Sequence, residues 1–172
     1  MKPHTQKHLT ILALFTTLAM AIYSVESLLP TLVPIPGIKL GLANIITLLV
    51  LKNFSAREAF WVLMMRIFLS TFLFGHMMSL FYSLAGGILC LFIMWSIHRL
   101  LKGSFLFLTS IFGALFHNIG QMLVAMLFTT SLAPLSYLPF FILSTTITGL
   151  FTGLCAHYTQ QYLGSFLKRQ LL

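Results

Sequence analysis

The sequence predicts an all-α integral membrane protein with six transmembrane helices in one domain, residues 1–172. Of these residues, 59% are hydrophobic and only 7% are charged, whereas soluble domains carry about 25% charged residues. The mean hydropathy is +1.00. Too little polar surface exists for a water-soluble globule, so we expect a lipid bilayer around most of the chain. Basic residues are dispersed between apolar runs, so the net charge of +8 does not indicate nucleic-acid binding.

Six apolar segments are candidate membrane spans. A bilayer core of roughly 30 Å needs about 20 helical residues, and only helices satisfy every backbone polar group within one segment. The expected spans cover residues 9–29, 37–52, 58–74, 79–98, 105–128 and 135–162.

The first span, residues 9–29, contains the only carboxylate expected inside the membrane, Glu26. Its basic start and the pattern Ala19-Met20-Ala21 also resemble a signal peptide. Its apolar stretch is longer than usual for one, and its removal would unbalance the distribution of charge described below. We therefore expect this segment to be retained as a membrane span.

The second and third spans are short. The second, 37–52, follows Pro34 and Pro36, so we expect it to be tilted, broken or partly buried in protein. The third, 58–74, contains Arg66. The remaining three spans are long and apolar, and the sixth carries a pair of small residues at helical spacing that favours close helix contact.

Basic residues fall on one side of the six-span arrangement. The positive-inside rule places the side rich in Lys and Arg in the cytoplasm, and both chain termini with it. Eight of the ten basic residues lie on this side: Lys2, Lys7, Lys52, Arg57, Arg99, Lys102, Lys168 and Arg169.

Three charged residues lie in or beside the expected spans: Glu26, Lys39 and Arg66. An ionisable group inside a membrane costs about 2.5–3.5 kcal/mol on insertion scales, so we expect Glu26 to pair with Arg66 or Lys39. These residues indicate a ligand site near the outer face. The alternative is a structural ion pair, a Glu26 side chain that reaches the outer interface, or a merely interfacial Lys39.

The fifth span carries three hydrogen-bonding side chains within five positions. His117 and Gln121 are one helical turn apart and share a face, and Asn118 partly overlaps it. Such a cluster at mid-bilayer can recognise a polar ligand group, or it can make interhelical hydrogen bonds. Asn44, near the outer half of the second span, has the same two interpretations.

No catalytic constellation is present in the sequence. It lacks a phosphate-binding loop, and it contains no aspartate that would hold magnesium on a diphosphate. We therefore expect no enzyme activity by this chain alone, no metal and no cofactor. Transport against a gradient would need either protons coupled through Glu26 or His117, or energy from another subunit.

Small residues form a stripe on the first span at Ala13, Thr17 and Ala21. One turn of helix separates each from the next, so a second helix can approach closely along this line. Internal packing is one interpretation, and docking of a partner membrane protein is the other.

Four sequence segments resemble the bacterial Gx transporter family, which is also labelled heptaprenyl diphosphate synthase component I. The resemblance runs over roughly residues 9–160. It is carried by VESLLP at 25–30, PIPGIKLGLANIIT at 34–47, SLAGG at 83–87 and GALFHNIGQ at 113–121.

The resemblance implies an S component of an energy-coupling factor (ECF) transporter in a bacterial cytoplasmic membrane. S components are small six-helix bundles that bind a vitamin or similar molecule from the outer side. They associate with a transmembrane coupling subunit and two ATPases, often through small residues of the first helix, a role that Ala13, Thr17 and Ala21 would fill. The substrate would be vitamin-, quinone-precursor- or flavin-related. Its expected binding residues are Glu26, Lys39, Asn44, Arg66, His117, Asn118 and Gln121.

The second family label implies a different partner, the catalytic subunit of a prenyl diphosphate synthase. Such synthases resemble one another in Asp-rich motifs, which this chain lacks. On this alternative the chain is a non-catalytic membrane component in quinone biosynthesis.

Overall fold

The computed structural model describes residues 3–28, 39–74 and 77–171. The other residues lie outside the described part of the chain; they include Lys2 and the motif positions Pro30, Pro34, Pro36, Gly37 and Ile38. The described elements are six α-helices and one short 3-10 helix: α1 (Pro3–Leu28), α2 (Asn44–Asn53), α3 (Ala56–Phe74), α4 (Met77–Leu100), α5 (Leu106–Thr129), η1 (Ala133–Tyr137) and α6 (Leu138–Leu171).

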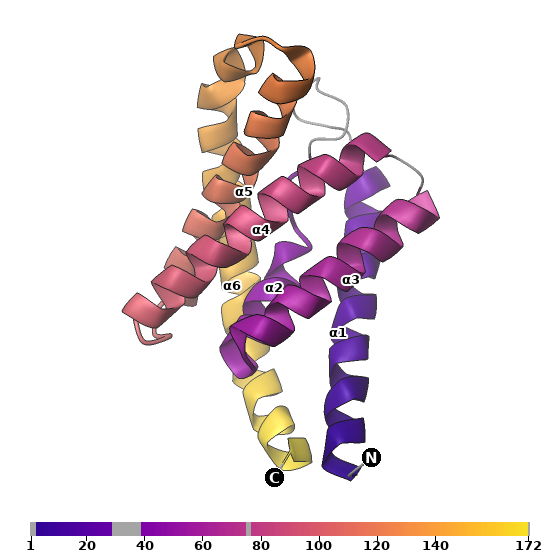
Figure 1. Cartoon of the computed structure of the whole chain (residues 1–172). Coiled ribbons are helices and arrows are strands. Elements are labelled where there is room, and N and C mark those ends of the chain that lie inside the picture. Colours follow the sequence, from indigo (N-terminus) through magenta and orange to yellow (C-terminus); the bar gives the residue numbers. More distant parts are fainter. Residues whose placement is uncertain (1–2, 29–38, 75–76, 172) are drawn as a thin grey trace.

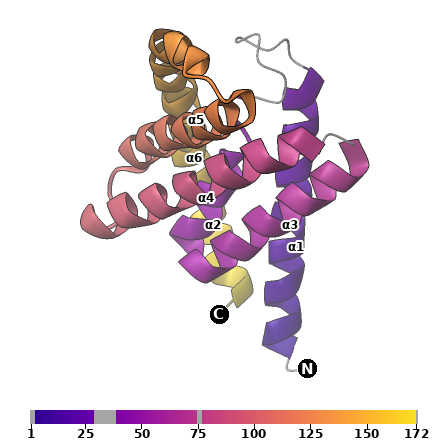
Figure 2. The ribbon, with the colours of Figure 1, turned by 45° about the horizontal axis from the view of Figure 1, so that its top comes forward.

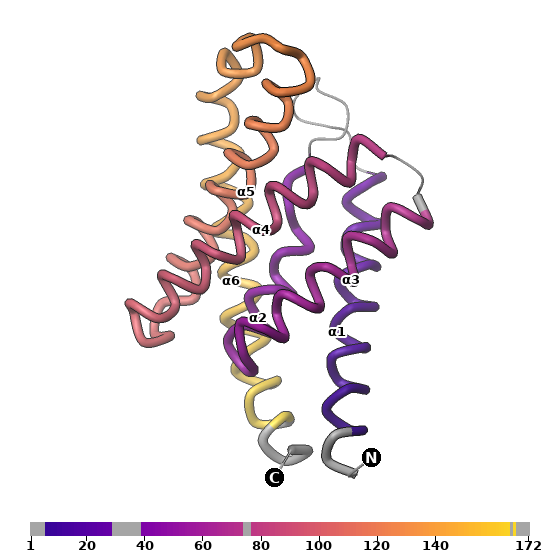
Figure 3. Tube along the Cα trace, in the orientation of Figure 1, coloured from indigo at the N-terminus to yellow at the C-terminus, as the bar shows by residue number. Residues whose placement is uncertain are grey.

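The helices run in two main directions. In Figure 1, α1 and α6 run roughly upright, whereas α3 and α4 run diagonally across the front of the molecule. Figure 2 shows these two diagonal helices side by side. The start of α1 and the end of α6 lie at the same end of the molecule (Figure 3).

Four helical segments in the described chain are long and apolar enough to cross a membrane. They are Gln6–Leu28, Met77–Leu100, Leu106–Thr129 and Ala133–Ser165. Many large apolar side chains on the outer faces of these helices are exposed, among them Leu18, Phe92 and Leu127. An apolar outer surface of this extent is unusual for a soluble monomer and is the surface that lipid requires.

The second expected span differs most from the structure. The sequence predicted a helix from residue 37, but residues 39–43 are not helical and α2 begins only at Asn44. Gly41 has a positive φ of 82°, which a regular helix does not tolerate. The ten residues of α2 extend roughly 15 Å, too short for a bilayer core. Most of α2 is buried within the protein, so it does not need to meet lipid along its length.

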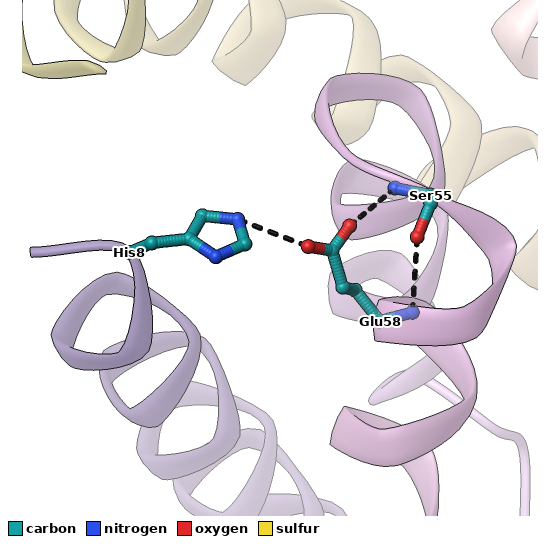
Figure 4. Close-up of polar contacts among 3 residues, drawn as sticks. All are labelled: His8, Ser55 and Glu58. Atoms are coloured by element: carbon teal, nitrogen blue, oxygen red, sulfur yellow. Dashed lines mark hydrogen bonds and ion pairs between the residues drawn. The ribbon is translucent and has the colours of Figure 1, made fainter. Parts of the chain in front are cut away.

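Helix α3 has 19 residues but carries Arg57, Glu58 and Arg66, which set it apart from the four apolar spans. Its first turn is a capping box, a pattern that our sequence analysis did not use. The Ser55 backbone N–H donates to Glu58 Oε2 at 2.7 Å, and the Glu58 N–H donates to Ser55 Oγ at 3.3 Å. His8 Nε2 of α1 lies 3.0 Å from Glu58 Oε1 (Figure 4).

Glycines bring α4, α5 and α6 close together. A Cβ on Gly120 of α5 would lie 2.7 Å from the carbonyl oxygen of Ala85 on α4. On α6, Cβ atoms at Gly149 and Gly153 would each lie 2.7 Å from a Cα atom of α5. Side chains larger than glycine would force these backbones apart, so the three helices form one closely packed unit. The expected small-residue pair on the sixth span is therefore used for internal packing.

Candidate functional site

Glu26 connects α1 to the segment before α2. Residues Phe15, Ala19, Tyr23 and Glu26 recur every three or four positions and form the buried face of α1. The Glu26 carboxylate accepts hydrogen bonds from the backbone N–H groups of Gly41 at 2.6 Å and Leu42 at 2.9 Å. These N–H groups precede the start of α2, so the negative charge lies where the helix dipole favours it.

The expected ion pair of Glu26 is absent: within the described chain, no oxygen of Glu26 lies within 4.0 Å of a Lys39 or Arg66 nitrogen. Both cations are near enough to act on Glu26 electrostatically. The carboxylate instead uses its two oxygens for the backbone, because two N–H groups at close range satisfy it without bringing a long cationic side chain into contact.

Both cations lie near the aromatic ring of Tyr23. Lys39 Nζ lies 3.5 Å from the centre of the Tyr23 ring, and the Arg66 guanidinium carbon lies 5.8 Å from it. The Tyr23 hydroxyl is 2.9 Å from Ser79 Oγ of α4. One tyrosine thus links α1, the 39–43 segment, α3 and α4 through cation–π and hydrogen-bond contacts.

His117 and Gln121 supply the side of the cluster formed by α5. Both are almost fully buried, and Gln121 Nε2 lies 2.7 Å from His117 Nε2. Gln121 Oε1 accepts a hydrogen bond from the Lys39 backbone N–H at 3.2 Å. A Cβ on Gly41 would lie 2.8 Å from both His117 Cδ2 and Asn44 Nδ2, so this glycine lets the 39–43 segment lie directly on α5.

Several buried polar atoms in this cluster have no hydrogen-bond partner among the described residues. They are both side-chain polar atoms of Asn44, Nε and Nη2 of Arg66, and Nδ1 of His117. Asn44 is 4% exposed and Arg66 is 3% exposed. A buried donor left unpaired costs about 1–3 kcal/mol, and more when it is charged. Asn44 and Arg66 are therefore the side chains in the cluster with the most capacity to bind a ligand.

Six of the seven residues expected to bind substrate converge on this cluster: Glu26, Lys39, Asn44, Arg66, His117 and Gln121. Asn118 does not. It is turned about 100° from His117 and donates through Nδ2 to Thr145 Oγ1 of α6 at 2.5 Å. For Asn118 the interhelical alternative is the one that the geometry favours.

Two residues of the cluster, Tyr23 and Ser79, are absent from the expected binding residues. Tyr23 lies three residues before Glu26, so it shares the buried face of α1, and that spacing was the available signal. Ser79 had no comparable signal, because its role depends on the approach of α4 to α1.

The stripe of Ala13, Thr17 and Ala21 lies on the opposite, exposed face of α1. The Thr17 hydroxyl bonds the Ala13 carbonyl oxygen at 3.0 Å, so its polar group is satisfied within the helix. The stripe does not take part in internal packing and is available to lipid or to another protein. Over residues 3–28, 39–74 and 77–171, no group of three metal-ligating side chains is placed to hold an ion.

Comparison with known proteins gives one family. The family model described as heptaprenyl diphosphate synthase component I matches residues 15–159. No curated protein and no solved structure matches. The matched region contains every residue of the polar cluster.

Proposed function

The chain belongs to the heptaprenyl diphosphate synthase component I family, and we propose that it is the substrate-binding membrane subunit of an ECF-type transporter. The observation that carries this proposal is the buried polar cluster, in which Asn44 and Arg66 keep unpartnered groups among the described residues. Proteins hydrogen-bond nearly all buried polar atoms. A small polar molecule bound in the cluster would supply the partners that the described residues do not.

The roles within the cluster follow from the contacts. Arg66 and Asn44 bind the substrate. Glu26 and Gln121 hold the 39–43 segment in place through its backbone N–H groups, and His117 orients Gln121. Asn118 fixes α5 against α6 and acts on the site only indirectly.

In this proposal the chain crosses a bacterial cytoplasmic membrane six times, with both termini in the cytoplasm. The cluster then lies toward the outer face, from which a vitamin-, quinone-precursor- or flavin-related molecule enters. The shared end of α1 and α6 (Figure 1) and the basic residues of the intervening loops support this orientation. The short α2 and the charged α3 make the two shortest crossings.

Energy for transport comes from a coupling subunit with two ATPases, because the chain has no nucleotide-binding motif. We propose that the coupling subunit docks on the exposed stripe of Ala13, Thr17 and Ala21. Affinity purification from the host in mild detergent, with quantitative mass spectrometry, tests this association. Recovery of a transmembrane subunit with two ATPases is the expected result.

A matched pair of variants locates the docking surface. Thr17→Leu adds bulk to the stripe, and Thr146→Leu makes the same change on the exposed face of α6. Both hydroxyls bond a carbonyl oxygen four residues earlier, at 3.0 and 2.9 Å, so the two variants lose the same internal contact. We expect Thr17→Leu to reduce recovery of the coupling subunit about tenfold and Thr146→Leu to leave it unchanged, since close helix packing tolerates only small side chains. Equal recovery with both variants would place docking elsewhere.

The second candidate function is a non-catalytic membrane component of a heptaprenyl diphosphate synthase, as the family's name indicates. Two loops, Lys52–Glu58 and His98–Ser104, offer a contact surface for a soluble catalytic subunit. They are joined in the structure, where Lys52 Nζ donates to the Gly103 carbonyl oxygen at 2.8 Å. Recovery of a prenyl synthase in place of the ATPases, and its loss on neutralising the exposed Arg57 and Lys102, would favour this candidate.

A further inference from the structure

We infer that the substrate carries an anionic group, a carboxylate or a phosphate, which binds edge-on to Nε and Nη2 of Arg66. The inference rests on the proposed function and narrows the class of substrate. It depends on three properties of the described site: the unpartnered edge of Arg66, the charge of its surroundings and the lack of an internal counter-ion.

The two unpartnered nitrogens of Arg66 lie on one edge of the guanidinium. Nε and Nη2 have no hydrogen-bond partner in the described part of the chain, and their N–H bonds point in nearly the same direction. This edge matches the two oxygens of a carboxylate or phosphate, which accept a pair of parallel hydrogen bonds. A neutral carbonyl oxygen can accept hydrogen bonds from this edge but cannot balance the charge of the guanidinium.

The cluster holds an excess of positive charge. Two cations, Lys39 and Arg66, face one carboxylate, Glu26, and both cations act on it electrostatically. The oxygens of Glu26 already accept the Gly41 and Leu42 N–H groups. An isolated buried charge is strongly unfavourable, so an anion of one negative charge would balance the site.

The chain cannot supply that anion itself. It contains only two acidic residues, Glu26 and Glu58. Glu58 bonds the Ser55 N–H group and lies against His8 at the start of α3, about two helical turns from Arg66. A second negative charge, which would balance Lys39 and Arg66 together, would therefore come from a bound anion.

Anion-dependent stabilisation of the purified full chain tests the inference. The melting temperature in detergent is measured with inorganic phosphate, inorganic diphosphate or acetate, each against chloride at equal ionic strength. We expect a saturable rise with at least one of these oxyanions. A rise with acetate alone assigns a carboxylate ligand, and a rise with phosphate or diphosphate alone assigns a phosphorylated one.

Three variants attribute the effect to Arg66. Arg66→Gln should lose the rise and, without oxyanion, melt at or above the wild-type temperature, because it removes an uncompensated buried charge. Arg66→Lys keeps the charge but not the two-donor edge. Half of the maximal rise in melting temperature should therefore need about tenfold more anion than in the wild type. Arg57→Gln, at an exposed arginine of the same helix, should respond like the wild type. If Arg66→Gln does not fold, the anion-dependent rise in melting temperature is compared between Arg66→Lys and Arg57→Gln, and that comparison tests the role of Arg66.

No rise with any oxyanion, or a rise that persists in the Arg66 variants, would overturn the inference. These outcomes are separable from failure of the proposed function. A chain that recovers the coupling subunit and ATPases but shows no Arg66-dependent rise remains a transport subunit with a neutral substrate. A chain with the Arg66-dependent rise that recovers no ATPases binds an anion in another role.

Discussion

Replacing Glu26 with glutamine tests whether this residue holds the 39–43 segment or binds the substrate directly. In the structure its two oxygens accept N–H groups from Gly41 and Leu42 at 2.6 and 2.9 Å. Glutamine has the same shape but only one acceptor oxygen. Its amide NH₂ would face the second backbone N–H, so one of the two hydrogen bonds must break and leave a buried donor unpaired.

The expected loss of stability follows from these contacts. A hydrogen bond to a charged group contributes about 1.5–3 kcal/mol, a neutral one about 0.5–1.5 kcal/mol, and an unpaired buried donor costs about 1–3 kcal/mol. Glu26→Gln weakens one hydrogen bond and breaks the other, so we expect the free energy of unfolding to fall by about 2–4 kcal/mol. The carboxylate is 5% exposed, so solvent does little to compensate.

The chain provides a matched control in its only other acidic residue. Glu58 also accepts a backbone N–H group before a helix, but its side chain is 25% exposed. Glu58→Gln should therefore lose about 0.5–1 kcal/mol, since water replaces the lost bond and an exposed ion pair with His8 contributes little. Denaturant unfolding in detergent, followed by fluorescence of the two tryptophans, measures both variants.

Equal losses in the two variants, or a Glu26→Gln protein as stable as the wild type, would refute the helix-capping role of Glu26. Substrate affinity distinguishes the roles further. A capping Glu26 predicts that the folded Glu26→Gln protein still responds to oxyanions, because the Arg66 edge is intact. If Glu26 couples protons to transport, Glu26→Gln would instead abolish transport without this loss of stability.

Two further predictions concern the packing of α5. Gly120→Ala would place a Cβ 2.7 Å from the Ala85 carbonyl oxygen, and the backbone would have to move by about 0.7 Å to reach the 3.4 Å of an ordinary contact; we expect a net destabilisation of about 1–2 kcal/mol. On α6, a Cβ at Gly164 would lie 3.0 Å from Nε2 of Gln160, a side chain that two hydrogen bonds hold to Asn53. Gly164→Ala needs only a small shift of that side chain and should destabilise less than Gly120→Ala. Thermal unfolding that ranks the two variants in the opposite order would contradict the packing. For Asn118 and Thr145, a double-mutant cycle with Asn118→Leu and Thr145→Val should give a coupling energy of about 0.6 kcal/mol, and a value of zero would remove the interhelical role of Asn118.

The polar cluster lies where two parts of the molecule meet. Arg66 and Tyr23 come from α3 and α1, whereas His117 and Gln121 belong to the closely packed unit of α4, α5 and α6. A substrate that bonds Arg66 and Asn44 would join both parts. Binding would then stabilise the chain as a whole, since a ligand that binds only the folded state shifts the unfolding equilibrium.

The helical class and the apolar outer surface follow from the sequence alone. Apolar runs of 20 residues or more leave few structural alternatives in lipid, and each of the four membrane-length apolar segments of the structure begins and ends within three residues of an expected boundary. Helical periodicity also put His117 and Gln121 on one face. These properties are local, because they depend on residues within a few turns of each other.

Which polar side chains contact one another depends on the tertiary structure. In the structure, Glu26 binds two backbone N–H groups in place of the expected cation, and Asn118 bonds α6. Arg66 keeps an open edge among the described residues. The tertiary structure also sets the start of α2 at Asn44, because Gly41 with its positive φ lies against His117 of a distant helix. Sequence reasoning cannot reach such choices, because each partner is selected by distances of a few tenths of an ångström between segments far apart in the chain.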